Sequence, residues 1–171
     1  MASFNISVLD PDNAAELSAL AALAQELWHD TYDPLLPDGQ VDYMIEKYQS
    51  VPVLEKAVRE EGYRYYLAWD GGTLAGYCGV KPETDKRALF LSKIYVGLPY
   101  RRQGLARMFV NRALQDYAAF GLTYAYLTVN KENTRAIQSY KALGFETHDA
   151  VVTDIGGGYV MDDYIMQRAF E

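Results

Sequence analysis

The pattern of apolar and polar positions divides the chain into a helical first third and a later part in which strands and helices alternate. Phe4, Ile6 and Val8 alternate with their neighbours, as in a strand, and the next segment is rich in Ala, Leu and Glu, which favour helix. Gly and Pro residues mark most of the breaks. The pattern predicts strands at about 4–9, 63–69, 73–80, 88–96, 124–129, 145–152 and 159–168, and helices at about 14–28, 40–48, 52–61, 103–120 and from 133 or 134 to 144.

The order of these elements indicates an α/β arrangement built on a mixed sheet. A chain of 171 residues suits one domain with a sizeable core, which we take as residues 1–171. Asp70-Gly71-Gly72 is a strong hairpin signal, and Gly76 indicates a bulge or a place of close packing.

A strand, a tight loop and a helix meet at residues 88–120, and this stretch carries the clearest chemistry. The backbone N–H groups at the start of a helix have no partner inside the helix, so they attract an anion. Gly104 has no Cβ to obstruct a phosphate, and Arg101 and Arg102 supply charge. The stretch therefore predicts a pyrophosphate site, and the alternative is an ordinary strand-turn-helix with solvated arginines.

The loop resembles the acetyl-CoA loop of the GNAT superfamily of N-acetyltransferases, because Arg101-x-x-Gly104-x-Ala106 follows a strand that ends Lys93-Ile-Tyr-Val96. A second block, from Asn130 to Phe145, resembles the strand-helix unit that follows in that family. The resemblance covers roughly residues 88–148. It implies a single GNAT-type domain whose central mixed, splayed β-sheet has about seven strands and is flanked by helices on both faces.

The resemblance also implies a set of residues that bind acetyl-CoA as the co-substrate. Backbone groups of the central strand would bind the pantetheine and polarise the acetyl carbonyl, an effect typically worth ~10²-fold or more in rate. The loop would hold the pyrophosphate, two asparagines would reach the pantetheine arm and a lysine would approach the phosphates. Helix capping and solvent exposure are the alternatives for the asparagines and the lysine. These residues are Ile94, Tyr95 and Val96; Arg101, Arg102, Gln103, Gly104, Leu105 and Ala106; Asn130 and Asn133; and Lys141.

Tyr140 lies where the family places its general acid, so the resemblance implies that it protonates the departing thiolate. A phenol with a pKa of ~10 can give a proton to a thiolate whose acid has a pKa of ~8.5. The alternative is packing, because the chain has 15 tyrosines. Some family members use a Glu of the central strand as the base, but Ser92 and Lys93 stand in that region here. We hypothesise a water chain that leads to an acid.

The acceptor pocket is expected from the early helices and the last hairpin. Aromatic faces and carboxylates suit an alkylammonium group, and core packing is the alternative for each aromatic residue. The candidates are Trp28, Tyr32, Asp33 and Tyr43, with Asp162, Asp163 and Tyr164.

The net charge of −7 is concentrated early, because residues 1–50 hold nine acidic residues and one lysine, or −8. This asymmetry suggests a cationic ligand, and solubility is the alternative explanation. The sequence has no stripe of basic residues of the kind that binds nucleic acid, and no apolar run approaches the length of a membrane span. One cysteine, Cys78, and two histidines cannot form a His/Cys zinc site, and we expect no metal.

The sequence therefore predicts an acetyl-CoA-dependent N-acetyltransferase for a small cationic amine. The strand end Lys93-Ile-Tyr-Val96 and the ending Gly158–Met166 also resemble bacterial acetyltransferases related to polyamine-acetylating enzymes, so a polyamine is the first candidate acceptor. The alternatives are acetylation of a protein N-terminus or lysine, and a non-catalytic acyl-CoA sensor. The single cysteine and the absence of a signal-peptide pattern favour the cytoplasm, and a homodimer is compatible with the family.

Overall fold

The computed structural model describes residues 3–170, which form a seven-stranded sheet and five α-helices in the predicted order. The strands are β1 (Asn5–Val8), β2 (Arg64–Asp70), β3 (Thr73–Glu83), β4 (Ala88–Val96), β5 (Tyr124–Asn130), β6 (Glu146–Gly156) and β7 (Tyr159–Ala169). The helices are α1 (Ala14–Tyr32), α2 (Gln40–Gln49), α3 (Val51–Glu60), α4 (Leu105–Asp116) and α5 (Thr134–Ala142).

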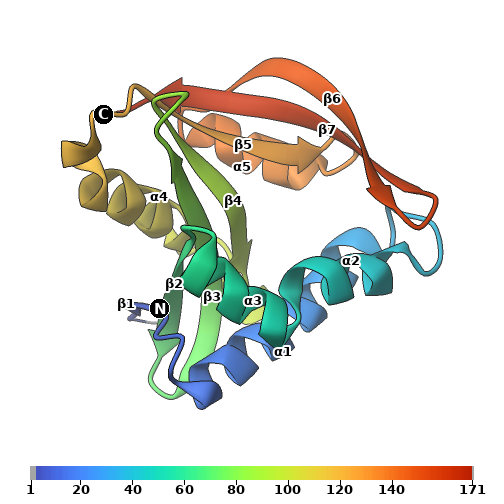
Figure 1. Cartoon of the computed structure of the whole chain (residues 1–171), viewed down its shortest axis with the longest axis horizontal. Coiled ribbons are helices and arrows are strands. Elements are labelled where there is room, and N and C mark those ends of the chain that lie inside the picture. Colours follow the sequence, from blue (N-terminus) through green and yellow to red (C-terminus); the bar gives the residue numbers. More distant parts are fainter. Residues whose placement is uncertain (1–2, 171) are drawn as a thin grey trace.

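The sheet has the order β1-β2-β3-β4-β5-β7-β6 and is antiparallel except where β4 pairs with β5. That parallel pairing covers only Ala88–Phe90 against Tyr124–Tyr126. Beyond it the two strands diverge, so β1–β4 and β5–β7 form two arms of one sheet (Figure 1). The mixed, splayed sheet of seven strands is confirmed.

Helices cover both faces of the sheet, as predicted. On one face, Phe109 and Val110 of α4 and Ile137 of α5 pack in a cluster with Leu89 and Leu127 of the two diverging strands. The other face carries α1, α2 and α3, which bury two further clusters centred on α1 (Figure 1). The opening between β4 and β5 is thus flanked by helices, and the burial of their apolar side chains against the sheet fixes their positions.

Most element boundaries agree with the sequence pattern, and β4 agrees at both ends. Helix α1 runs four residues past its predicted end, because Trp28 and Tyr32 bury one more turn against β4 and α2. Helix α4 begins at Leu105 rather than at 103, since Gly104 has a φ of 81° and its backbone is left-handed. The expected single helix to 120 ends at Asp116 and continues as a short 3-10 turn.

Gly76 marks both a bulge and a close approach. The register of β2 against β3 shifts between Ala68 and Trp69, which leaves Ala75 without a partner beside Gly76. A Cβ at Gly76 would lie 2.7 Å from the Tyr95 carbonyl oxygen, so only glycine lets β3 and β4 pack this closely here.

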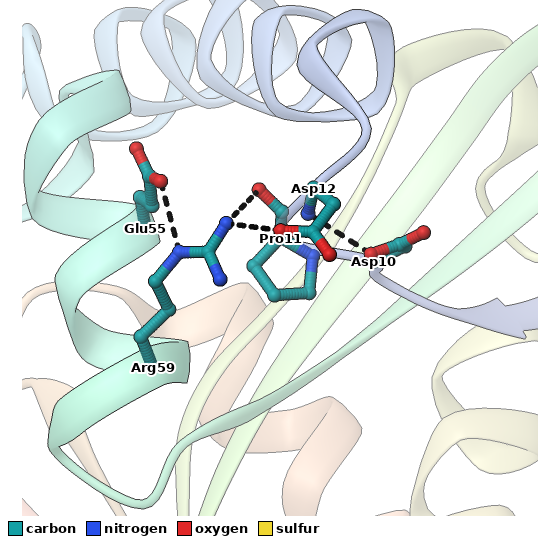
Figure 2. A network of polar contacts seen from close by, with 5 residues as sticks. All are labelled: Asp10, Pro11, Asp12, Glu55 and Arg59. Carbon is teal, nitrogen blue, oxygen red and sulfur yellow. Dashed lines mark hydrogen bonds and ion pairs between the residues drawn. The ribbon is translucent and has the colours of Figure 1, made fainter.

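An exposed polar network fixes α3 against the start of α1 (Figure 2). Arg59 donates to Glu55 Oε2 at 2.9 Å, to the Pro11 carbonyl oxygen at 3.1 Å and to the Asp12 carboxylate. Asp10 Oδ1 accepts from the Asp12 N–H at 2.9 Å and closes the turn before α1. Within residues 3–170, no helix is long and apolar enough to cross a membrane.

Candidate active site

The divergence of β4 from β5 opens a cavity of about 620 Å³ that is lined by both strands, α4, α5 and the end of α1. A bulge in β4 contributes to this opening. Gly79 pairs with Lys93 and Val80 with Leu91, so Ser92 is an extra residue without a partner on β3. Bulges increase local twist and redirect side chains, and this one lies at the point where the strand leaves β5.

The loop between β4 and α4 forms a concave cradle of backbone N–H groups at one end of the cavity. Arg102 and Gly104 both have positive φ, 63° and 81°, which turns successive N–H groups toward the same side. The N–H groups of Arg102, Gly104, Leu105 and Ala106 donate to no atom of residues 3–170. A Cβ at Gly104 would meet no protein atom within 4 Å, so the space in front of the cradle is open.

Arg101 is an anchor for this cradle. Its Nη2 donates to Asp30 Oδ2 of α1 at 3.1 Å, and its Nε donates to the Val96 carbonyl oxygen at 3.2 Å. Its Nη1 is buried and has no partner within the described residues, although the residue lines the cavity. Arg101 therefore ties the loop to α1 and leaves one buried donor unpaired within the described residues.

Tyr140 of α5 lines the same cavity as the cradle. Its ring packs edge-on against Phe145 with centroids 6.3 Å apart, and the side chain is half-buried. Burial raises the pKa of the Tyr140 hydroxyl well above its usual value, and the neighbouring Tyr32 and Cys78 add to the rise. The phenol therefore stays protonated at neutral pH and can donate a proton.

An aromatic cluster forms the part of the cavity that faces α1. The hydroxyls of Tyr32 and Tyr95 are 2.8 Å apart, and Tyr95 stacks on Tyr77 with centroids 5.4 Å apart. Trp28 Nε1 donates to the Tyr77 hydroxyl at 2.8 Å and fixes the stack from α1. Burial raises the pKa of Tyr32 to about 12, so this hydroxyl is also neutral.

Asp163 of β7 lies beside this cluster as a buried carboxyl group that is 8% exposed. Its Oδ1 has no hydrogen-bond partner among residues 3–170. Burial raises the pKa of Asp163 to about 6, the charge of Asp162 adds to the rise and Lys131 opposes it. The Asp163 charge in turn contributes to the raised pKa of Tyr32.

Lys93 lies on β4 next to the bulged Ser92. Its Nζ donates to Ser92 Oγ at 2.6 Å and lies 5.5 Å from the centre of the Tyr63 ring. Burial lowers the pKa of Lys93 to about 8, although Glu61 opposes this change. No three His, Cys, Asp or Glu side chains within 3–170 are grouped so that they could hold a metal ion.

The structure brings many of the predicted site residues to the cavity, which Leu91, Ser92, Lys93, Thr128 and Ser139 also line. The predicted residues that line it are Ile94, Tyr95, Val96, Arg101, Arg102, Gly104, Leu105, Ala106, Asn133, Tyr140 and Tyr32. Asn133 also caps α5, because its side chain accepts from the Ala136 N–H at 3.3 Å. It thus combines the two roles that the sequence left open as alternatives, a cavity position and a helix cap.

Other predicted residues of the coenzyme group lie elsewhere. Asn130 is 5% exposed, and its Oδ1 accepts from the Glu132 N–H at 2.9 Å, so it shapes the turn before α5. Lys141 is exposed on α5 outside the cavity lining, and Gln103 Nε2 donates to the Pro99 carbonyl oxygen at 3.3 Å.

Most of the proposed acceptor residues also have other partners. Asp33 is bound to His29 at 3.0 Å and Asp162 to Lys131 at 2.9 Å, and both carboxylates are more than half exposed. The Tyr43 hydroxyl donates to the Ile155 carbonyl oxygen at 2.7 Å. Trp28 supports the tyrosine stack from behind, and Tyr164 packs on the α5 side. Of the acceptor candidates, Tyr32 lines the cavity, and Asp163 lies outside the lining, on the same face of β7 as Met161, which packs with Tyr32.

Comparisons with known proteins show the family of this chain. The model of the acetyltransferase (GNAT) family matches residues 20–145. An uncharacterized N-acetyltransferase of Mycobacterium tuberculosis (strain ATCC 25618 / H37Rv) is 30% identical over 97 residues, which are 57% of this chain and 61% of that protein. The match thus spans less than two thirds of that relative's length.

Two solved structures share the fold over nearly the whole chain. The PaiA N-acetyltransferase of Thermoplasma acidophilum, in complex with coenzyme A, has a TM-score of 0.80 and 20% identity over 98% of this chain and 99% of its own. The spermidine N-acetyltransferase of Vibrio cholerae, in complex with coenzyme A and spermine, has a TM-score of 0.66 and 22% identity over 97% and 95%. By its fold, this protein belongs to the class of acetyltransferases. The chain belongs to the acetyltransferase (GNAT) family.

Proposed function

We propose that this protein is an acetyl-CoA-dependent N-acetyltransferase that acetylates the primary amine of a small cationic acceptor, with a polyamine as the first candidate. The observation that carries the proposal is that one cavity, between the diverging strands β4 and β5, is lined by both the N–H cradle and Tyr140. An anion site and a buried proton donor thereby face the same space, as transfer from a coenzyme thioester requires.

The residues present fit coenzyme A. The unpaired N–H groups of Arg102, Gly104, Leu105 and Ala106 provide donors for a diphosphate at the start of α4, where the helix dipole also favours negative charge. The open space in front of Gly104 admits a group as large as a phosphate. Asn133 and the edge of β4 beyond Phe90 line the path from the cradle into the cavity.

Different groups of the chain perform the separate steps of the transfer. The edge of β4 that has lost β5 as a partner supplies backbone groups that polarise the acetyl carbonyl, where a single such donor is worth about 10²-fold or more. Tyr140 holds its proton at neutral pH because burial raises its pKa, and it gives that proton to the departing sulfur. The apolar lining from Leu91, Ile94 and Leu127 limits access of water to the thioester.

Three observations support a cationic acceptor. The cavity wall near α1 is aromatic, and aromatic faces attract ammonium groups. The chain is acidic, with a net charge of −7. The Vibrio cholerae neighbour is a spermidine N-acetyltransferase bound to spermine.

The test is thiol release from acetyl-CoA in the presence of putrescine, spermidine, spermine, a lysine-containing peptide and a peptide with a free N-terminus. We expect turnover with at least one polyamine and none with the peptides. Turnover with a peptide alone indicates a protein acetyltransferase, and coenzyme A binding without turnover on any acceptor indicates a sensor. Either result rejects the proposal.

Tyr140→Phe tests the role of the phenol. We expect a fall in kcat of about 10²-fold or more with coenzyme A affinity unchanged, because the variant loses a proton donor and keeps the ring. Tyr124→Phe, on β5 outside the cavity lining, is the control and should retain kcat. An unchanged kcat in Tyr140→Phe contradicts the assignment.

A further inference from the structure

We propose that Asp163 is the catalytic carboxylate on the acceptor side: it binds the ammonium group of the acceptor and takes its proton before the nitrogen attacks the thioester. This inference rests on the proposed N-acetyltransferase function and names the base for it. It places the base on β7, the strand beside β5, instead of on the central strand β4.

The position of Asp163 on β7 directs it toward α1. Side chains alternate along a strand, so Met161 and Asp163 share one face. Met161 packs in the cluster that contains Trp28 and Tyr32 of α1. The Asp163 charge also contributes to the raised pKa of Tyr32.

Asp163 has the features of a carboxylate that awaits a ligand. It is 8% exposed, and its buried Oδ1 has no donor within residues 3–170. Buried polar atoms without partners are rare, and buried carboxylates are normally paired. A protonated amine brings up to three N–H donors and a positive charge, so it satisfies both the unpaired oxygen and the buried charge.

Tyrosine hydroxyls connect Asp163 with the reaction centre. Tyr32 bonds to Tyr95 at 2.8 Å, and both residues line the cavity that Tyr140 lines. The rings of Tyr32 and Tyr95 also pack edge to face, with centroids 6.5 Å apart. An acceptor nitrogen held beside Tyr32 lies in the cavity that Tyr140 lines, on the side toward which the Met161 and Asp163 face of β7 packs.

Other acids near this region are already occupied. Asp30 is paired with Arg101 at 3.1 Å, Asp33 with His29 at 3.0 Å and Asp162 with Lys131 at 2.9 Å. Asp163 is the acid among these whose buried oxygen lacks a partner in the part of the chain that the structure describes.

The ammonium nitrogen gives one proton to the Asp163 carboxylate, and its lone pair forms the N–C bond to the acetyl carbonyl carbon of the thioester. The C–S bond breaks, and the sulfur takes the Tyr140 proton. The amide nitrogen loses its second proton to solvent as Tyr140 is reprotonated, and Asp163 releases its proton to solvent before the next cycle.

Asp163→Asn tests the base directly, because the amide keeps the shape and cannot take a proton. With spermidine we expect kcat/KM to fall by about 10²–10⁴-fold. With trifluoroethylamine, which is largely unprotonated at neutral pH, we expect a fall of less than about tenfold, since the acceptor needs no deprotonation. Asp149→Asn, an exposed acid on β6, is the control and should match wild type with both acceptors.

The pH profile provides a readout that a purely structural role does not move. The acidic limb of kcat/KM in wild type reports the proton affinity of Asp163, which Tyr32, Asp162 and Lys131 influence. In Asp163→Asn we expect this limb to be replaced by a rate that keeps rising with pH toward the amine pKa of ~10.4, because only unprotonated spermidine then reacts. Asp163→Ser, checked for folding by circular dichroism and for coenzyme A binding, provides a second variant.

A carboxyl NMR titration of the wild-type protein needs no turnover. We expect one aspartate signal, absent from Asp163→Asn, to titrate near pH 6 and to move to lower pH when spermidine is added. A signal that spermidine does not move overturns the inference. Equal losses on both acceptors, or wild-type rates in Asp163→Asn, also overturn it and leave the N-acetyltransferase function standing. A wild type inactive on every amine removes that function and this inference with it.

Discussion

The buried carboxyl group of Asp163 should lower the stability of the folded protein at neutral pH, and Asp163→Asn should recover that stability. Burial raises the pKa of this group from 3.8 to about 6, with Asp162 adding to the rise and Lys131 opposing it. An uncharged amide of the same size avoids the cost of removing a charge from water. The substitution therefore should stabilise the protein even though it abolishes the proposed proton transfer.

The magnitude follows from the pKa change. One pKa unit corresponds to about 1.4 kcal/mol, so a rise from 3.8 to about 6 lowers stability by about 3 kcal/mol above pH 6. Between pH 3.8 and about 6 the folded wild type binds a proton that the unfolded chain releases. The stability of the wild type relative to Asp163→Asn therefore falls as pH rises through this window.

Urea unfolding at pH 4 and pH 7 measures the effect. We expect the two proteins to have similar unfolding free energies at pH 4, and Asp163→Asn to be more stable by up to about 3 kcal/mol at pH 7. In a domain of this size each kcal/mol corresponds to about 2–4 °C in Tm. Asp149→Asn controls for the loss of one negative charge. A variant that is less stable than wild type at pH 7, or a difference that does not depend on pH, refutes the reasoning.

Two further predictions concern the cradle and the junction of α1 with α2. Gly104→Ala should weaken coenzyme A binding about tenfold or more, because its Cβ fills the space in front of the N–H groups and strains a backbone at φ 81°. The control is Gly62→Ala, because Gly62 also has a positive φ, 80°, and no protein atom near the position of a Cβ. This variant adds the same strain far from the cradle and should bind coenzyme A normally. Equal losses of coenzyme A affinity in the two variants, measured by calorimetry, would contradict the assignment. His29 bonds to Asp33 at 3.0 Å and to Asp42 at 2.9 Å, and the bond to Asp33, with the smaller effects of both carboxylates, raises its pKa above 6.5. The stabilisation by the imidazolium is therefore complete below pH 6.5 and is lost as pH rises through the higher pKa of the folded state. In urea unfolding, His29→Gln should destabilise the protein at pH 6 and destabilise it less at pH 8. A loss of stability that is the same at both pH values would contradict this prediction.

Local signals in the sequence were sufficient for much of the fold. Strand β4 has turn residues on both sides, and its predicted bounds agree with the structure. The hairpin at Asp70-Gly71-Gly72 follows from its turn chemistry. The start of α4 was placed too early, because the left-handed conformation of Gly104 reflects the shape of the loop and not helix propensity.

The site was less predictable because its parts come from distant segments. The ion pair between Arg101 and Asp30 joins residues 71 positions apart, and the local pattern around either residue gives no sign of it. The splay between β4 and β5 is predictable only from the family resemblance, since the sequence of neither strand shows where the pairing between β4 and β5 ends. Asp163 stands next to Asp162 in the sequence, and only the fold shows that one carboxylate is buried and the other exposed.

The central claim is that the cradle at residues 101–106 binds the diphosphate of coenzyme A. Amide hydrogen exchange with and without coenzyme A tests it most directly, because the N–H groups of Arg102, Gly104, Leu105 and Ala106 have no acceptor within residues 3–170. We expect rapid exchange of these four amides in the free protein and marked slowing when coenzyme A is bound. Coenzyme A binding that leaves their exchange rates unchanged, or protection confined to another surface, would show that the diphosphate does not bind at residues 101–106.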